Sequence, residues 1–228
     1  MTRHVAVLMG GWSAERDVSL SSGKACSDAL ERAGYRVTRI DVLKDLRALL
    51  TALDPKPDVV FNALHGRGGE DGVVQGVLEM LGIPYTHSGV AASAIAMDKP
   101  LTKAVLAAAG IPVADGAVLP PERLGQEEPI ARPYVVKPAR EGSSVGVYIV
   151  EQGTNGPDYS GWSFGDALVE EYIPGRELTV GVMEDHALGI TELRPRTRFY
   201  DYQAKYTDGV TEHLCPAPVP EEIAEACK

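Results

Sequence analysis

The chain has little of several features that mark other classes of protein. Its three cysteines, Cys26, Cys215 and Cys227, are odd in number and form no C-x-x-C pair. We therefore expect reduced thiols rather than a disulfide framework or a cysteine metal site. No apolar stretch approaches the length of a membrane span, and the apolar run at the N-terminus is too short for a signal peptide. The sequence thus predicts a cytoplasmic protein.

Positive charge is also scarce. The 22 basic residues stand against 32 acidic residues, which gives a net charge of −10. This balance argues against nucleic acid or an anionic membrane as a general partner. It does not exclude ATP, because a few local cations can bind a triphosphate. A length of 228 residues allows one large domain or two to three small ones.

The first ninety residues alternate between apolar strands and helices. We expect strands at residues 5–9, 35–42, 58–64 and 83–86, and helices after residue 16, at 43–53 and at 73–81. This alternation predicts a parallel sheet with helices on both faces. The apolar side of the first helix is expected to comprise Val18, Ala25, Ala29 and Leu30.

Ligands of such a sheet bind beyond the carboxyl ends of its strands. Gly10, Glu15 and His65 fall at these ends. Glu70 and Asp71 are interpreted as helix-start residues, and Asp71 can cap the helix at 73–81.

A second unit begins near Ser93. A helix is expected at residues 99–109, followed by a surface connection rich in Pro, Glu and Gly at 120–132. Residues 133–137 and 145–150 are expected to form antiparallel strands, and residues 177–193 a hairpin. Residues 167–172 fit either a helix or a strand.

A small-residue loop joins the two strands at 133–150. Residues 134–147 read YVVKPAREGSSVGV, so an apolar strand ends in Lys137 before Gly and Ser follow. Such a loop can bring backbone N–H groups and hydroxyls to a phosphate, while the lysine supplies positive charge. It is not the usual P-loop, because G-x-x-x-x-G-K-[ST] occurs nowhere in the chain.

Five segments resemble the D-alanine–D-alanine ligases of the ATP-grasp superfamily, in the order and spacing of that family. They read LMGGWSAERDVS at 8–19, HGRGGEDG at 65–72, MDK at 97–99, KPAREGSSVG at 137–146 and FYDYQAKY at 199–206. The resemblance covers the whole chain. It implies an α/β protein in which a Rossmann-like parallel sheet domain (1–92) precedes an ATP-grasp fold. That fold would comprise a central subdomain with a glycine-rich flap (93–172) and the start of a C-terminal subdomain with an omega loop (173–228).

The resemblance assigns substrate roles to residues that could otherwise be structural. Glu15, which could be a helix-start carboxylate, would receive the ammonium of the first D-alanine. His65 would lie near the carboxylate of that substrate. Ser143 would join Tyr206 and Glu15 in a catalytic triad that closes two loops over the reactants. Lys205 would bind the carboxylate of the second substrate, and Tyr206 favours a dipeptide over a D-lactate product.

The resemblance also implies an ATP site. Lys99 and Lys137 would bind the phosphates, although Lys99 could be an ordinary surface lysine, and the flap would contribute Ser143 and Ser144. The adenosine would meet Glu170, Glu171, Ile173 and Glu177, of which Ile173 would cover the adenine ring and Glu177 would accept from the ribose hydroxyls. Glu170 and Glu171 could instead belong to a solvated acidic face.

The sequence departs from the family at its end. Residues 220–228 fit the first turns of a helix, whereas family members continue with an acidic strand pair, an E-x-N-P-G-like segment and an arginine. We therefore expect a truncated form that is inactive alone and has no metal ligands of its own. The expected ligands of Mg²⁺, with Mn²⁺ as an alternative, would lie beyond Lys228.

The resemblance implies ATP-dependent joining of two D-alanines through a D-alanyl phosphate, for peptidoglycan precursors, by a homodimer. Three alternatives stay open at this point. One is a related D-alanine–D-lactate ligase. Another is a nucleotide-binding remnant without catalysis, and the last is a flavodoxin-like binding module, which would explain only residues 1–90.

Overall fold

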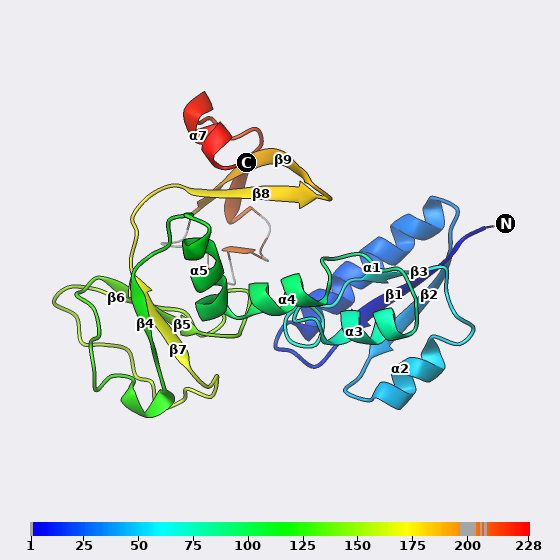
Figure 1. Ribbon diagram of the computed structural model, residues 1–228, viewed down its shortest axis with the longest axis horizontal. Coiled ribbons are helices and arrows are strands. Elements are labelled where there is room, and N and C mark those ends of the chain that lie inside the picture. Colours follow the sequence, from blue (N-terminus) through cyan, green and yellow to red (C-terminus); the bar gives the residue numbers. More distant parts are fainter. Residues whose placement is uncertain (1, 197–203, 206, 208) are drawn as a thin grey trace. The chain divides into compact units, whose positions relative to one another are not determined.

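A computed structural model describes residues 2–196, 204–205, 207 and 209–228 (Figure 1). The chain forms two compact units. The first comprises Met1–Val113 and Ala139–Gly142, and the second comprises Ala114–Pro138 and Ser143–Lys228. The expected domain boundaries at residues 92 and 172 stay predictions.

The first unit is built on a parallel sheet of three strands in the order β2-β1-β3. The central strand β1 (His4–Gly10) is buried along its whole length, between β2 (Arg36–Val42) and β3 (Val59–Asn62). The strand expected at residues 83–86 is reduced to a single parallel bridge between Val60 and Tyr85. The predicted parallel sheet is thus confirmed.

Helices cover both faces of this sheet, as predicted (Figure 1). Residues of β1 alternate between the two faces, because successive side chains of a strand point to opposite sides. One face packs against α2 (Leu46–Ala52) and α3 (Val73–Met80), and the other packs against α1 (Arg16–Arg32). Two further helices, α4 (Val90–Met97) and α5 (Lys99–Ala108), complete the unit, and α4 was not predicted.

The predicted buried side of α1 is wrong in part. Ala25 and Ala29 are exposed, whereas the fully buried positions are Ser19, Gly23 and Ser27. These residues recur every four positions and therefore form one stripe along the helix. A search for apolar residues alone cannot find a stripe made of Ser and Gly.

Small residues are required on this side because α1 lies very close to β1. A β-carbon at Gly23 would lie only 2.4 Å from Cβ of Met9. Ser19 Oγ donates to the carbonyl of Ala63 over 2.7 Å and accepts from the amide of Gly10 over 2.9 Å. Leu30, by contrast, packs against the core as predicted.

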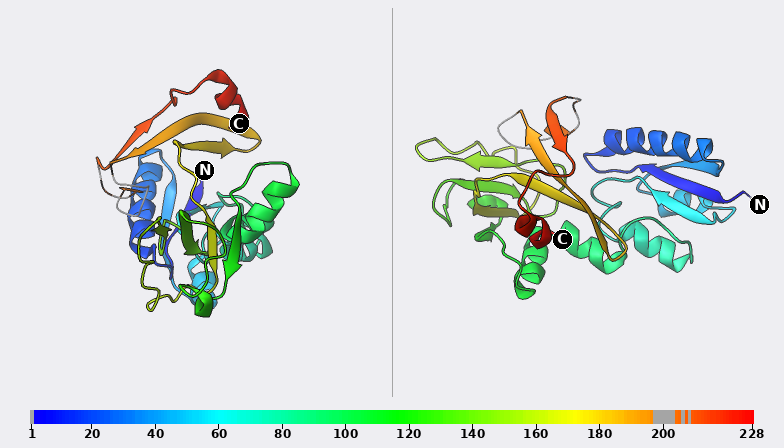
Figure 2. Two further views of the ribbon diagram at one scale, coloured as in Figure 1. Left: turned by 90° about the vertical axis from the view of Figure 1, so that its left-hand side faces the viewer. Right: turned by 90° about the horizontal axis from the view of Figure 1, so that it is seen from above.

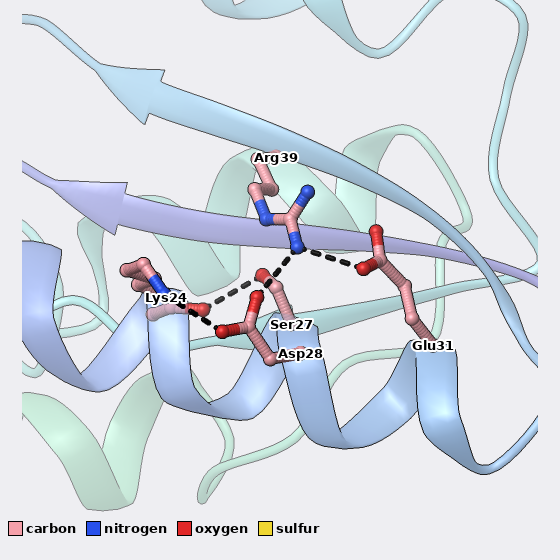
Figure 3. A network of polar contacts seen from close by, with 6 residues as sticks. Lys24, Ser27, Asp28, Glu31 and Arg39 are labelled. Carbon is pink, nitrogen blue, oxygen red and sulfur yellow. Dashed lines mark hydrogen bonds and ion pairs between the residues drawn. The ribbon is translucent and has the colours of Figure 1, made fainter.

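A network of charged side chains joins the outer side of α1 to β2 (Figure 3). The guanidinium of Arg39 donates to Asp28 over 2.8 Å and to Glu31 over 2.9 Å, and Lys24 donates to Asp28 over 2.8 Å. Lys24 and then Arg39 lower the pKa of Asp28. Each of these exposed ion pairs contributes little to the free energy of unfolding. The two pairs made by Arg39 nevertheless connect β2 to α1.

The second unit contains two antiparallel sheets (Figure 2). The four-stranded sheet has the order β4-β7-β5-β6, formed by β4 (Gly116–Leu119), β7 (Ala167–Glu171), β5 (Tyr134–Pro138) and β6 (Tyr148–Val150). The strands around the glycine-rich loop are therefore confirmed, and residues 167–171 are a strand rather than a helix. A short 3₁₀ helix, η1 (Pro121–Arg123), lies in the expected surface connection.

The other sheet has the order β10-β9-β8. The predicted hairpin is formed by β8 (Glu177–Met183) and β9 (His186–Pro195), and β10 (Thr211–Leu214) pairs with β9. Helix α7 (Glu221–Ala226) follows. Among the described residues no helix is long and apolar enough to cross a membrane.

Candidate active site

Glu15 lies where the chain turns from β1 into α1. The turn passes through Gly10 and Gly11, whose φ angles of +84° and +82° favour glycine. Glu15 is the residue before the first turn of α1 and is only 4% exposed. A carboxylate that is this buried needs polar or cationic partners. Its position therefore suits a site that receives a cationic group.

Ser13 joins this turn to the loop that follows β3. The Ser13 hydroxyl donates to the carbonyl of His65 over 2.7 Å and accepts from the amide of Glu15 over 3.1 Å. Gly66 also approaches the carboxylate, because a β-carbon there would lie 2.6 Å from Oε2 of Glu15. Ser13 thus joins the backbone of Glu15 to that of His65, beyond the carboxyl ends of β1 and β3. The substrate roles of the two side chains stay predictions.

The loop at residues 66–72 is shaped by its own acidic side chains. Glu70 accepts from the amide of Gly66 over 2.6 Å, and Asp71 accepts from the amide of Gly68 over 2.8 Å. Asp71 also accepts from the amide of Val73 over 3.2 Å, at the start of α3. The N-cap residue of α3 is Gly72, without a side-chain cap, so the predicted cap by Asp71 is wrong in position. Asp71 lies one residue earlier and fixes the loop at the start of the helix.

Asn62, at the end of β3, and Gln75, on α3, hold this loop by hydrogen bonds. Both side-chain amides donate to the carbonyl of Gly69 over 2.8 Å. Both residues are buried, and Oε1 of Gln75 has no hydrogen-bond partner among the described residues. Two buried donors on one carbonyl fix the backbone beside His65, since a buried amide is costly to leave unpaired.

Residues 139–142 form a third segment beside Glu15. Lys99, at the start of α5, donates through its backbone amide to the carbonyl of Ala139 over 3.0 Å and through Nζ to the carbonyl of Glu141. Gly142 then passes so close to Glu15 that a β-carbon would lie 3.0 Å from Oε2. The carboxylate of Glu15 is therefore flanked by two glycines, Gly66 and Gly142.

The second unit contains the residues expected around a nucleotide except Lys99, which belongs to the first unit. Lys137, on β5, forms an ion pair with Glu170 on the neighbouring strand β7. The backbone amide of Glu171 donates to the carbonyl of Asp115 over 2.9 Å, which fixes the end of β7. Ile173 lies just beyond and is 62% exposed, so its side chain is available to a ligand.

Glu177 and Lys205 influence each other electrostatically. Partial desolvation of the Glu177 carboxylate raises its pKa, and the charge of Lys205 opposes this rise. The residue as a whole is exposed, so only its carboxylate is partly shielded from water. Such a carboxylate is available to accept hydrogen bonds from a ligand.

The flap has an unusual backbone at its two serines. Ser143 and Ser144 have φ angles of +48° and +59°, which non-glycine residues adopt at a cost. Gly146 follows with φ of +68°, and a β-carbon there would lie 2.8 Å from the ring of Phe164. Tyr206 lies outside the described residues, so the triad of Glu15, Ser143 and Tyr206 stays a prediction.

An aromatic cluster lies beside the base of the flap. Phe164 contacts Trp162 edge-on with ring centroids 5.2 Å apart, and Trp162 contacts Tyr159 and Tyr148. Burial raises the pKa of Tyr159 to about 12. The cluster packs against the core of the four-stranded sheet and restricts where the flap leaves it.

Ser13, Asn62 and Gln75 were not singled out from the sequence as parts of the site. Ser13 stands two residues before Glu15 in the same motif, which was the available signal. The sequence contains no comparable signal for Asn62 and Gln75, because their role depends on the path of the loop between them. In the described part of the chain no group of three His, Cys, Asp or Glu side chains could bind a metal ion.

Family models match most of the chain. The model described as "D-ala D-ala ligase C-terminus" matches residues 105–228, and "D-ala D-ala ligase N-terminus" matches residues 48–88. A D-alanine–D-alanine ligase of Granulibacter bethesdensis is 58% identical over 94% of this chain and 71% of its own length. A D-alanine–D-alanine ligase of Sphingopyxis alaskensis is 56% identical over 99% of this chain and 75% of its own length.

Solved structures agree with these matches. The D-alanine–D-alanine ligase of Bacillus anthracis is 33% identical, with a TM-score of 0.78 over 98% of this chain and 75% of that protein. The same ligase complexed with ATP is 32% identical, with a TM-score of 0.76 over 99% of this chain and 74% of that one. Together with the buried carboxylate at the sheet edge and the flap with its lysine, these matches show that the chain belongs to the D-alanine–D-alanine ligase family.

Proposed function

We propose that this chain binds D-alanine and ATP through the residues described above. The function is the ATP-dependent joining of two D-alanines into D-alanyl-D-alanine, a precursor of peptidoglycan. The observation that carries the site assignment is the buried carboxylate of Glu15 between Gly66 and Gly142. A buried carboxylate suits the ammonium group of an amino acid, because a buried charge needs an opposite charge or hydrogen-bond partners.

The first D-alanine is placed by Glu15 and His65. Glu15 accepts from its ammonium, and His65 lies near its carboxylate. The carboxylate of this substrate attacks the γ-phosphorus of ATP, which gives D-alanyl phosphate and ADP. The amine of the second D-alanine then attacks the acyl carbon, and phosphate leaves. A free carboxylate is a poor electrophile, so its phosphorylation is the step that makes the bond possible.

Lys99 and Lys137 bind the phosphates of ATP in this proposal. Their charges offset the negative charge of the triphosphate and of the moving phosphoryl group. Lys137 is paired with Glu170, so it exchanges one anionic partner for another when the nucleotide binds. Ile173 covers the adenine, Glu170 and Glu171 line its edge, and Glu177 accepts from the ribose hydroxyls.

The flap keeps water from the acyl phosphate. Ser143 and Ser144 present backbone N–H groups and hydroxyls beside the reactants, and Ser143, Tyr206 and Glu15 form the closing triad. Excluding water is required because a hydrolysed acyl phosphate would waste the ATP. Lys205 binds the carboxylate of the second D-alanine, and Tyr206 favours the amine of D-alanine over D-lactate.

Mg²⁺, or Mn²⁺ in its place, accompanies ATP in this proposal. The described residues offer no cluster that fits the ion, so no step here is assigned to a protein-bound metal. The resemblance further favours a homodimer that works in the cytoplasm, where ATP is available.

Replacement of the Glu15 charge tests the proposal. Glu15→Gln keeps the shape of the side chain but removes the partner of the substrate ammonium. We expect KM for D-alanine to rise about 10- to 100-fold in the complete gene product, with KM for ATP nearly unchanged. Asp17→Asn, two residues further along and exposed, is the matched control. An unchanged KM for D-alanine in Glu15→Gln would contradict the assignment.

A further inference from the structure

Asp98 uses both oxygens of its carboxylate at the start of α5. Oδ1 accepts from the backbone amide of Leu101 over 3.0 Å, which makes Asp98 the N-cap of the helix. Oδ2 accepts from Nε of Arg140 over 2.7 Å. Arg140 is the principal cause that lowers the pKa of Asp98, and the bond to Leu101 is the next. One carboxylate therefore connects the first turn of α5 to residues 139–142.

Lys99 adds two connections to the same segment. Its amide donates to the carbonyl of Ala139, which is buried, and its Nζ donates to the carbonyl of Glu141. Three consecutive residues, 139 to 141, are thus bonded to Asp98 and Lys99. The side chain of Arg140 is more than half exposed, and its ion pair with Asp98 ties it to the first turn of α5.

Gly142 follows these three residues directly. A β-carbon at Gly142 would lie 3.0 Å from Oε2 of Glu15, so the segment and this carboxylate are in close contact. Ser143 and Ser144 then adopt left-handed backbone angles, a conformation that persists only where the surrounding structure imposes it. The position of the segment before them decides both where Gly142 meets Glu15 and how the flap begins.

We propose that Asp98 and Arg140 are positioning residues that keep residues 139–142 against Glu15 and so shape the site of the first D-alanine. They act through Gly142 and need no contact with the substrate. The inference rests on the proposed role of Glu15 for its functional consequence, whereas the positioning itself is a property of the protein without ligands.

Asp98→Asn and Arg140→Gln separate this role from the helix cap. Asparagine caps helices as well as aspartate, so Asp98→Asn keeps the bond to Leu101 and loses the ion pair. Arg140→Gln leaves Asp98 intact. Asp28→Asn, which breaks the exposed pairs of Asp28 with Lys24 and Arg39, is the control with the same change of charge.

Hydrogen exchange of the chain without ligands measures the positioning. We expect both variants to exchange the amides of residues 142–146 about tenfold faster than the parent protein, and Asp28→Asn to leave them unchanged. The double variant should exchange no faster than either single one, because both remove the same contact. Unchanged exchange in both single variants would overturn the inference, whatever the protein catalyses.

Kinetics of the complete gene product measure the consequence. We expect KM for D-alanine at the first site to rise about tenfold in both variants, and more ADP than dipeptide to form, because a loosened flap admits water to the acyl phosphate. Faster exchange with unchanged KM and equal ADP and dipeptide would overturn the role in shaping the site. Absence of D-alanine-dependent activity in the parent protein would instead refute the proposed function, and the exchange result would still decide the positioning.

Discussion

Gly142 lies so close to Glu15 that a β-carbon at Gly142 would stand 3.0 Å from the carboxylate oxygen Oε2. The φ angle of Gly142 is not in the left-handed range, so alanine meets no backbone penalty there. The only strong effect of a Gly142→Ala substitution should be to displace the Glu15 carboxylate.

Gly142→Ala should therefore impair substrate binding without unfolding the protein. We expect KM for D-alanine to rise about tenfold, with a free energy of unfolding within about 0.5 kcal/mol of the parent. Gly161→Ala is the control, since a β-carbon at Gly161 meets no atom within 4 Å. Equal KM values for the two variants would show that the approach of Gly142 to Glu15 has no role in binding.

Lys137→Ala should weaken nucleotide binding through the phosphates. We expect the affinity for ATP to fall about tenfold or more, because a charge-assisted contact to a phosphate is lost, while the affinity for adenosine stays near its original value. Titration calorimetry with both ligands measures the difference, and Lys24→Ala controls for loss of an exposed lysine. A similar loss for ATP and adenosine would place Lys137 elsewhere than on the phosphates.

Glu192 should make the stability of the second unit depend on pH. Its carboxylate is buried and accepts from Arg176 twice over 2.7 Å and from Arg194 over 2.8 Å, and these guanidinium groups lower its pKa to about 2 from an ordinary 4.5. Because the folded pKa is the lower one, this stabilisation is complete above pH 4.5 and is lost as the pH falls towards 2.

Urea unfolding of the parent protein and Glu192→Gln from pH 7 to pH 3 checks this sign. The parent should be the more stable protein at pH 7, and its advantage should shrink steadily below about pH 4.5. Glu225→Gln is a control, because the partner of Glu225 is the exposed Lys228. An advantage that is constant down to pH 3 would contradict the lowered pKa.

Two helical glycines should respond to alanine with opposite signs. Gly23→Ala places a β-carbon 2.4 Å from Cβ of Met9, so we expect a loss of about 1–3 kcal/mol from overpacking. Gly76→Ala, in α3, meets only Cγ2 of Val90 at 3.9 Å and should stabilise the protein by about 0.5–1 kcal/mol. Thermal or urea unfolding measures both, and equal effects would show that α1 can move away from β1.

Elements with a regular pattern could be predicted from the sequence. The continuous apolar run of β1 identifies a strand that is buried on both faces. The alternation of apolar and polar residues in the β8–β9 hairpin identifies strands with one buried face. The helix expected at residues 43–53 is also present as α2, but it begins at Leu46 because Asp45 is its N-cap, which was not predicted from the sequence.

Other features have no sequence pattern from which they could be predicted. Helix α4 is a run of small and apolar residues without a helical period, and β4 and β10 are four residues each. The buried stripe of α1 consists of Ser and Gly, whose burial depends on how closely the sheet approaches.

Some residues of the candidate site could likewise be identified from the sequence, and others could not. Glu15, His65 and Lys137 follow strands or glycine turns, so their residue types and positions already indicate a ligand. Ser13, Asp98 and Arg140 act by contacts between segments that are distant in the sequence, such as the 42 positions between Asp98 and Arg140. Only the folded chain brings these partners together.

The most direct test of the account is the product balance of the complete gene product with Mg-ATP and either D-alanine or L-alanine. ADP and D-alanyl-D-alanine should form in equal amounts with D-alanine, and neither should form with L-alanine. ADP release that is independent of D-alanine, or that proceeds equally with L-alanine, would contradict the account.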